Sequence, residues 1–247
     1  MSLCDIHRYS ELLKKHVGLH VILPDAGDGP FPTFYLLHGL SDDYTNWVRR
    51  TRIEFYALNL PLIIVIPDGY RGFYTNAENG VPYARYIGEE TVGWIERFFP
   101  AKRSRDARFV GGLSMGGYGA LRLALGYPDV FGSTTSHSGA LMHGTRNPKE
   151  TALWEFEQVF GKNQAGTDHD LLKLAKEARD AKKLPRIRID CGTSDSLVKD
   201  NRDFHAALDE LGIAHEYEEF PGGHDWNYWD LHVRDALKFH LPDAGKK

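Results

Sequence analysis

The sequence contains little cysteine and no long apolar run, and each shortage excludes a class of protein. Two of its 247 residues are cysteine, Cys4 and Cys191, which is too few for a disulfide framework. The longest apolar run, "LPLIIVIP", is far shorter than the roughly 20 residues needed to cross a membrane. The N-terminal segment "MSLCDIHRYSELLKKH" does not have the basic and then apolar order of a signal peptide. We therefore expect a cytoplasmic protein with no membrane partner.

An excess of basic charge is also missing. The chain has 30 Lys and Arg residues against 34 Asp and Glu residues, a formal net charge of −4. Nucleic-acid binding usually needs a basic face, so no nucleic-acid partner is expected. The sequence shows no internal repeat and no low-complexity segment. We interpret residues 1–247 as one domain, and leave assembly into a homo-oligomer open.

Short apolar runs alternate with helical patterns, which predicts a parallel β-sheet covered by helices. Apolar side chains recur at helical spacing in three segments, 89–100, 196–212 and 228–242. An alternating segment at 14–29 predicts an antiparallel edge strand or hairpin. The fold class is therefore α/β, with a mostly parallel central sheet and helices on both faces. The predicted strands are 33–39, 61–69, 108–114, 132–139, 186–192 and 215–223.

Residues 141–184 form a long segment between two predicted strands. This segment contains the aromatic stretch "WEFEQVFG" and a helical pattern in "DHDLLKLAKEARDAKKLP". Long insertions on a rigid sheet often form lids or binding loops. The alternative is an ordinary crossover helix with a surface loop, and the sequence does not decide between them.

The stretch "GGLSMGG" at 111–117 places one serine among glycines at a predicted strand-to-helix turn. Gly112, Ser114 and Gly116 give the G-x-S-x-G pattern of a nucleophile elbow, in which the serine hydroxyl projects clear of the sheet. Larger side chains two positions before and after Ser114 would collide in so sharp a turn. The competing interpretation is a tight turn in which Ser114 only caps the helix. The strand before and the helix after favour a catalytic serine.

A serine nucleophile needs a base, which is expected to be a histidine oriented by a carboxylate. In this architecture the chain order is serine, carboxylate, histidine. Asp195 follows the predicted strand at 186–192, and His224 follows the next strand, so both have the required order and place. The alternative is that Asp195 only caps the N-terminus of the helix that follows it.

Other acidic and histidine residues are weaker candidates. Asp190 lies inside a strand, and His137 follows a strand beside the serine, where it is a candidate to line the pocket. A metal site on the C-terminal segment matches no compact metal-binding motif, so we expect no metal. Two further carboxylates, Asp200 and Asp203, lie within a predicted helix. The metal alternative consists of His224, Asp230 and His232.

The oxyanion of an acyl-transfer intermediate needs backbone N–H donors. One is expected from the residue after the nucleophile, Met115, and one from the loop after the strand at 33–39. That loop reads "HGLSDDYTNW", which makes the N–H of Leu40 the second donor. His38 is interpreted as a structural hydrogen-bonding residue in the same loop.

Aromatic residues cluster in the loops around the predicted site. Trp47, Tyr74 and Trp226 are the candidate substrate-binding residues, since aromatic rings bind acyl groups or stack on sugars. The alternative is that these rings only pack the loops against the core. The whole aromatic set is Tyr44, Trp47, Phe73, Tyr74, Trp226 and Trp229.

The elbow together with "LLHGLSDDYTNW", "CGTSDSL" and "GGHDWNYWD" resembles the esterase D branch of the α/β-hydrolases, over about residues 10–240. Bacterial tributyrin-type esterases are the nearest group by these motifs, with feruloyl esterases and S-formylglutathione hydrolases as relatives. The resemblance implies the α/β-hydrolase fold and no cofactor. It also implies Ser114, Asp195 and His224 as the triad, with Leu40 and Met115 as oxyanion donors.

The expected activity is that of a serine carboxylesterase acting on short-chain acyl esters, with acetyl or feruloyl groups on carbohydrates among the candidates. The expected partner is thus a small-molecule ester. Two alternatives stay open: a thioesterase of S-formylglutathione hydrolase type, and a non-catalytic binding protein with the same fold.

Overall fold

The computed structural model describes residues 1–25, 27–146, 153–162 and 164–242. Within these ranges, eight strands form one sheet in the order β1-β2-β4-β3-β5-β6-β7-β8. Strands β3 to β8 are parallel, whereas β2 pairs antiparallel with both β1 and β4. The strands are β1 (Ser2–Ser10), β2 (Lys15–Leu23), β3 (Thr33–Leu37), β4 (Ile63–Pro67), β5 (Arg108–Leu113), β6 (Ser133–His137), β7 (Arg186–Gly192) and β8 (Glu216–Phe220).

The six strands predicted for the parallel part are present, each somewhat shorter than predicted or of the same length. The N-terminal antiparallel part differs from the prediction. The segment at 14–29 contains β2, which lies inside the sheet, and the edge is formed by β1, which was not predicted. Burial alternates along β1, with Cys4, Ile6 and Arg8 partly buried and the residues between them exposed, but each face carries both apolar and polar residues, so the sequence shows no clear alternation.

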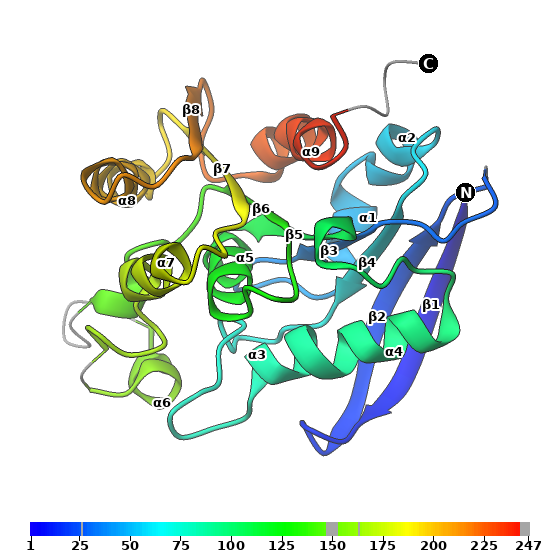
Figure 1. Ribbon diagram of the computed structural model, residues 1–247, viewed down its shortest axis with the longest axis horizontal. Helices are drawn as coiled ribbons and strands as arrows, with labels where there is room; N and C mark the ends of the chain where they lie inside the picture. The colour runs from blue at the N-terminus through cyan, green and yellow to red at the C-terminus, as the bar shows by residue number, and fades with distance from the viewer. Residues whose placement is uncertain (26, 147–152, 163, 243–247) are drawn as a thin grey trace.

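Helices cover both faces of the sheet (Figure 1). The predicted helical segments correspond to α4, α8 and α9, the first preceded by a π-helical turn at Tyr86–Thr91. Among the described residues, none of the helices is long and apolar enough to cross a membrane. The α-helices are α1 (Asn46–Arg50), α2 (Ile53–Ala57), α3 (Tyr83–Arg85), α4 (Val92–Phe98), α5 (Met115–Gly126), α6 (Phe156–Phe160), α7 (Leu171–Asp180), α8 (Val198–Glu210) and α9 (Trp226–His240).

The sheet separates two hydrophobic cores because side chains alternate along each strand. In β3, Tyr35 and Leu37 face the core under α4, α5, α7 and α8, whereas Phe34 and Leu36 face the core under α1, α2 and α9. All four side chains are fully buried. Full burial of one large apolar side chain contributes about 1.5–3 kcal/mol, so the two cores hold the sheet rigid under the loops that it supports.

The segment 141–184 contains α6 and α7. Helix α7 begins at Leu171 and is capped by Asp170, whose carboxylate accepts hydrogen bonds from two N–H groups of the first turn. Its apolar face packs against α5, so α7 is the crossover helix of the second interpretation. The rest of the segment includes residues 147–152 and 163, which lie outside the described residues. The lid interpretation concerns this part of the segment and stays a prediction.

Parallel strands end at a common edge of the sheet, and α/β proteins build their sites there. The loops after β5, β7 and β8 contain Ser114, Asp195 and His224, and β3 ends at the loop that contains Leu40. The topology thus brings all the predicted catalytic positions to one edge.

Candidate active site

Ser114 lies alone between the end of β5 and the start of α5, with φ 53° and ψ −116°. A residue other than glycine in this region is strained by roughly 1–3 kcal/mol and stays there only where its surroundings fix it. The backbone supplies that fixation: the N–H of Ser114 donates to the carbonyl of His137 at 2.9 Å, and its carbonyl accepts from the N–H of Ala140 at 3.1 Å. The nucleophile elbow predicted from the sequence is therefore present as backbone geometry.

The glycines on either side of Ser114 are required by close contacts. A Cβ atom on Gly112 would lie 2.7 Å from the backbone of Gly116 and from the carbonyl oxygen of Leu37. A Cβ atom on Gly116 would lie 2.6 Å from the same Leu37 oxygen. Because these neighbours are backbone atoms, they cannot move aside, and the first turn of α5 rests directly on the end of β3.

The three residues predicted as a triad lie in one hydrogen-bonded row. Nε2 of His224 lies 3.0 Å from Oγ of Ser114. Nδ1 of His224 lies 2.9 Å and 3.0 Å from the two carboxylate oxygens of Asp195. Since a carboxylate accepts hydrogen bonds, Nδ1 carries the hydrogen and Nε2 presents its lone pair to the serine hydroxyl.

The carboxylate of Asp195 has no exposed surface. Burial alone would raise the pKa of Asp195, but the hydrogen bond from His224 and the N–H of Leu197, at 2.7 Å, outweigh burial and lower it. Asp195 is therefore an ionised acceptor behind the imidazole. The ring of Trp229 meets the ring of His224 edge-on at 5.0 Å, which fixes the imidazole plane from the side. Sequence analysis placed Trp229 near the site but did not find this contact.

The two predicted oxyanion donors lie on neighbouring segments. Among the described residues, the backbone N–H groups of Leu40 and Met115 have no acceptor in the protein. Met115 begins α5, where the helix dipole also favours negative charge. The contact of Gly116 with the Leu37 and His38 carbonyls joins the start of α5 to the loop that contains Leu40.

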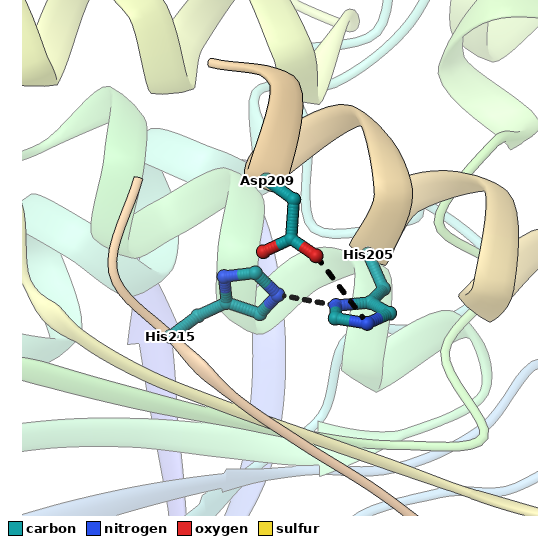
Figure 2. A group of neighbouring side chains, drawn as sticks. All are labelled: His205, Asp209 and His215. Carbon is teal, nitrogen blue, oxygen red and sulfur yellow. Dashed lines mark hydrogen bonds and ion pairs between the residues drawn. The ribbon is translucent and has the colours of Figure 1, made fainter. Parts of the chain in front are cut away.

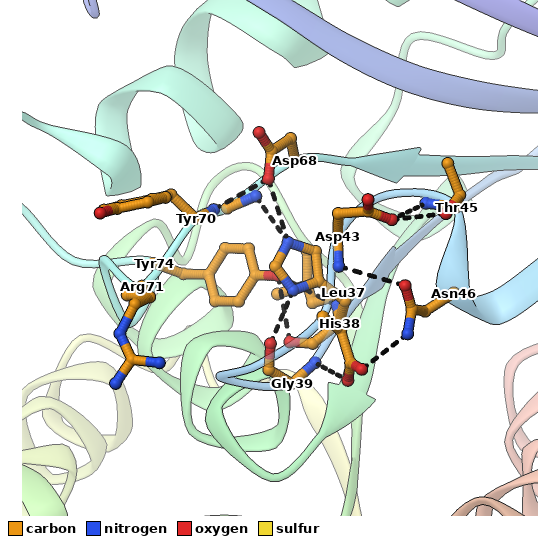
Figure 3. Close-up of polar contacts among 12 residues, drawn as sticks. Leu37, His38, Gly39, Asp43, Thr45, Asn46, Asp68, Tyr70, Arg71 and Tyr74 are labelled. Atoms are coloured by element: carbon orange, nitrogen blue, oxygen red, sulfur yellow. Dashed lines mark hydrogen bonds and ion pairs between the residues drawn. The ribbon is translucent and has the colours of Figure 1, made fainter.

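Tyr74 holds the loop after β3 through its hydroxyl group (Figure 3). The N–H of His38 donates to this hydroxyl at 3.0 Å, and the hydroxyl donates to the carbonyl of His38 at 3.1 Å. Burial raises the pKa of Tyr74 well above its ordinary value, so the hydroxyl keeps its hydrogen. The His38 ring adds two bonds, from the N–H of Gly69 to Nε2 at 2.9 Å and from Nδ1 to the Gly39 carbonyl at 2.8 Å. His38 is thus placed as the structural residue that the sequence indicated.

Residues 10–240 match the family described as "Putative esterase". The chain belongs to this esterase family. It is 34% identical to the acetyl esterase of Caldicellulosiruptor saccharolyticus over 260 residues, 97% of this chain and 98% of the relative.

Solved structures agree with the family. The substrate-bound fluorophosphonate-binding serine hydrolase F of Staphylococcus aureus has a TM-score of 0.89 and 32% identity, covering 97% of this chain and 98% of its own. An S-formylglutathione hydrolase of Staphylococcus aureus has a TM-score of 0.85 and 32% identity, covering 97% and 99%. The α/β-hydrolase fold and the class of carboxylic ester hydrolase, both expected from the sequence, are confirmed.

The three candidate substrate-binding aromatics of the esterase lie in different surroundings. Trp47 and Tyr74 are fully buried. The indole Nε1 of Trp47 donates to the carbonyl of Leu37 at 3.0 Å, so Trp47 and Tyr74 both support the end of β3 through hydrogen bonds. Trp226 is partly exposed and meets Trp47 edge-on at 5.3 Å. Of the three, Trp226 remains the one with surface to offer a substrate.

The alternative carboxylates of the esterase have other partners. The Asp190 carboxylate is buried against Nδ1 of His137 at 2.8 Å and accepts from the hydroxyl of Tyr228 at 3.0 Å. His137 has no exposed surface, so it does not line a pocket. Asp200 pairs with Arg146, and Asp203 pairs with Lys199.

The metal alternative on the C-terminal segment is not assembled. Asp230 accepts from Arg52 and from Tyr56, whereas His232 contacts Asp235. Neither Asp230 nor His232 hydrogen-bonds to His224, whose ring nitrogens face Asp195 and Ser114.

One contact of the oxyanion loop, the loop after β3 that contains His38, Gly39 and Leu40, was not predicted from the sequence. The guanidinium of Arg71 donates to the carboxylate of Glu155 at 2.6 Å and to the carbonyl of Leu40 at 3.4 Å. Glu155 is almost fully buried and belongs to the segment 141–184. Arg71 therefore ties that segment to the residue whose N–H is the predicted oxyanion donor. Arg71 and Glu155 are 84 positions apart, and no sequence pattern links them.

Proposed function

We propose that this esterase hydrolyses short-chain acyl esters through an acyl-enzyme on Ser114, with His224 as the general base and Asp195 as its orienting carboxylate. The observation that supports the proposal is the unbroken row of hydrogen bonds, with Oγ of Ser114 3.0 Å from Nε2 of His224 and Nδ1 2.9 Å from Asp195. This arrangement lets one imidazole take the hydroxyl proton and return it to a leaving group.

In the first half of the reaction, His224 Nε2 accepts the proton of Ser114 as Oγ attacks the ester carbonyl carbon. The imidazolium that forms is stabilised by the ionised Asp195 behind it. The carbonyl oxygen becomes an oxyanion, which the N–H groups of Leu40 and Met115 receive. One such donor is worth about 2.7–4 kcal/mol in the transition state.

The alcohol then leaves with the proton from His224, which forms the acyl-enzyme and completes the first half. In the second half, water enters and attacks the acyl carbon as His224 takes a proton from it. His224 returns this proton to Oγ of Ser114 as the carboxylic acid is released. All of the proton transfers pass through one nitrogen, Nε2, so the reaction as proposed needs no cofactor.

The preference for short acyl groups is supported by the acetyl esterase relative and by the ion pair of Arg71 and Glu155 next to Leu40. A charged pair offers no apolar contact to a long acyl chain bound near Leu40. A feruloyl or acetyl group on a carbohydrate is within this proposal, with Trp226 as the aromatic surface. The cytoplasmic location also remains a proposal, supported by two free cysteines.

The decisive experiment compares the wild-type chain with Ser114→Ala on a p-nitrophenyl acetate assay and with a fluorophosphonate label. We expect the variant to fold normally, to lose nearly all turnover and to lose the label. The remaining rate should be that of an oxyanion site without a nucleophile, about 10³–10⁴ over water. Labelling at another residue, with turnover retained in Ser114→Ala, would refute the proposed nucleophile.

A thioesterase of S-formylglutathione hydrolase type is the second candidate, favoured by the solved structure at 32% identity. The same triad serves both substrates, since both have an acyl carbonyl. The kcat/KM values for matched oxygen and thiol esters of one acyl group separate the candidates. A much higher value for the thiol ester would favour the second.

A further inference from the structure

A second cluster of polar side chains lies where α8 turns into β8, away from the proposed active site. His205 and Asp209 are four residues apart on one face of α8, and His215 lies just before β8 (Figure 2). Each offers one ligand atom, and these atoms all lie within 4.8 Å of one another. Sequence analysis singled out none of the three.

The three side chains converge because of how α8 ends. Gly212 has φ +64°, and its N–H donates to the carbonyl of Asp209 at 2.9 Å. The next N–H, of Ile213, donates to the carbonyl of Leu208 at 3.0 Å. This pair of bonds is the Schellman motif, and burial of Ile213 against the core reverses the chain. His215 is thereby carried back beside the last turns of the helix.

The hydrogen bonds of the two rings fix where the lone pairs point. Nδ1 of His215 lies 2.8 Å from the carbonyl of Ile213, which can only accept, so Nδ1 carries the hydrogen and Nε2 has the lone pair. That Nε2 lies 2.7 Å from Nδ1 of His205. The His205 ring is stacked on Tyr217 at 4.3 Å, which holds its plane. A backbone carbonyl behind a histidine is the usual support of a metal ligand.

The geometry points to a divalent transition-metal site formed by Nδ1 of His205, Nε2 of His215 and a carboxylate oxygen of Asp209, with Zn²⁺ as the fitting ion. Zinc binds histidine nitrogens at about 2.0–2.1 Å in tetrahedral geometry, which separates two nitrogens by about 3.3 Å. The rings would need to part by only about 0.6 Å from their present contact. The ion would replace the hydrogen now shared by the rings, and that hydrogen would move to Nε2 of His205, which faces Asp209, so that the ring stays neutral.

The donor set decides the class of ion. Two imidazoles and one carboxylate suit zinc, nickel or copper, whereas magnesium and calcium prefer oxygen ligands. Asp209 Oδ2 already lies 3.6 Å from Nε2 of His205, so negative charge stands beside the site. Arg202, one turn earlier on α8, is paired with both carboxylate oxygens of Glu219 and so leaves little positive charge to oppose a cation.

The place of the site in the fold assigns it a structural role. Asp195 precedes α8 and His224 follows β8, so both lie at the ends of these elements opposite to the turn at Gly212. An ion there joins the end of α8 to the start of β8 without contacting the reacting groups. We therefore expect metal binding to stabilise the fold and to leave ester turnover unchanged.

The test is a Zn²⁺ titration of the untagged full-length chain, freed of metal with EDTA, in competition with a chromogenic chelator. We expect one equivalent of tightly bound zinc, and a Co²⁺ titration should show the visible absorption of a tetrahedral site. His205→Ala and His215→Ala should each weaken zinc binding by more than about tenfold, a loss that even outer-shell changes can produce. His16→Ala, an exposed histidine elsewhere, is the matched control and should bind as the wild type does.

Thermal unfolding supplies an independent readout. Zinc at about 100 times its Kd should raise the Tm by roughly 5 °C or more in the wild type and in His16→Ala. It should not do so in His215→Ala, whose far-UV circular dichroism should be native. Unaltered zinc affinity in both His205→Ala and His215→Ala would overturn the site, as would stoichiometric binding that disappears only in His224→Ala.

Discussion

Replacement of Tyr74 by phenylalanine separates the two roles that this ring could have. If Tyr74 contacts substrate, as the sequence suggested, the change should act mainly on KM. In the structure the ring is fully buried, and its hydroxyl bridges the N–H and the carbonyl of His38. We therefore expect Tyr74→Phe to act on the shape of the oxyanion loop, and hence on kcat.

The magnitude follows from the two hydrogen bonds that are lost. Each buried polar group left without a partner costs about 1–3 kcal/mol, so the free energy of unfolding should fall by about 2–6 kcal/mol. Leu40 is two residues after His38, and its N–H is the proposed oxyanion donor. Complete loss of one donor costs about 10²–10³ in kcat. In Tyr74→Phe the N–H of Leu40 is displaced rather than removed, so kcat should fall by at least about tenfold.

The assay is steady-state hydrolysis of p-nitrophenyl acetate together with urea unfolding. Tyr118→Phe is the matched control, because the Tyr118 hydroxyl is also buried and donates to a backbone carbonyl, that of His169, at 2.8 Å. The control should lose stability but keep its kcat. A Tyr74→Phe enzyme with normal kcat and a raised KM would refute the supporting role and restore substrate contact.

Three further predictions concern the chemistry. Asp195→Asn should lower kcat by about 10⁴, whereas Asp203→Asn, an exposed helix residue paired with Lys199, should have nearly normal kcat; equal losses would contradict the triad. Across a p-nitrophenyl ester series, kcat/KM for acetyl to butyryl groups should exceed that for eight or more carbons by at least about tenfold, or about 1.4 kcal/mol; a maximum at long chains would refute the short-acyl proposal. EDTA should lower the Tm of metal-loaded enzyme and leave kcat unchanged, and abolished turnover would argue against a serine mechanism.

The central sheet and the elbow could be predicted because each leaves a local mark in the sequence. The central strands β3 and β4 are nearly continuous buried apolar runs, and the sharp turn at Ser114 needs glycine on both sides. The edge strand β1 leaves no such mark. Its Leu3 and Tyr9 are 40% and 44% exposed, so apolar and polar residues there do not separate into a buried and an exposed face.

The contacts that shape the site could not be predicted because they join distant segments. Trp47 and Tyr74 have residue types suited both to a pocket wall and to a core, and only the fold shows that they are buried. Likewise, Asp190 and Asp195 lie close together in the sequence. Which histidine each carboxylate contacts depends on how β7 pairs with β6 and β8. Chain order predicted that Asp195 and His224 act together, but it did not predict that the ring of Trp229 packs edge-on against the ring of His224.

The ion pair of Arg71 and Glu155 has a consequence for loop grafting between members of the family. Exchange of the 141–184 segment between two members would bring in Glu155 from one parent and leave Arg71 from the other. A graft that separates them leaves a buried charge without its partner, at a cost of up to about 3–5 kcal/mol, and frees the carbonyl of Leu40. A chimera that keeps this ion pair therefore needs position 71 and the distant segment from the same parent.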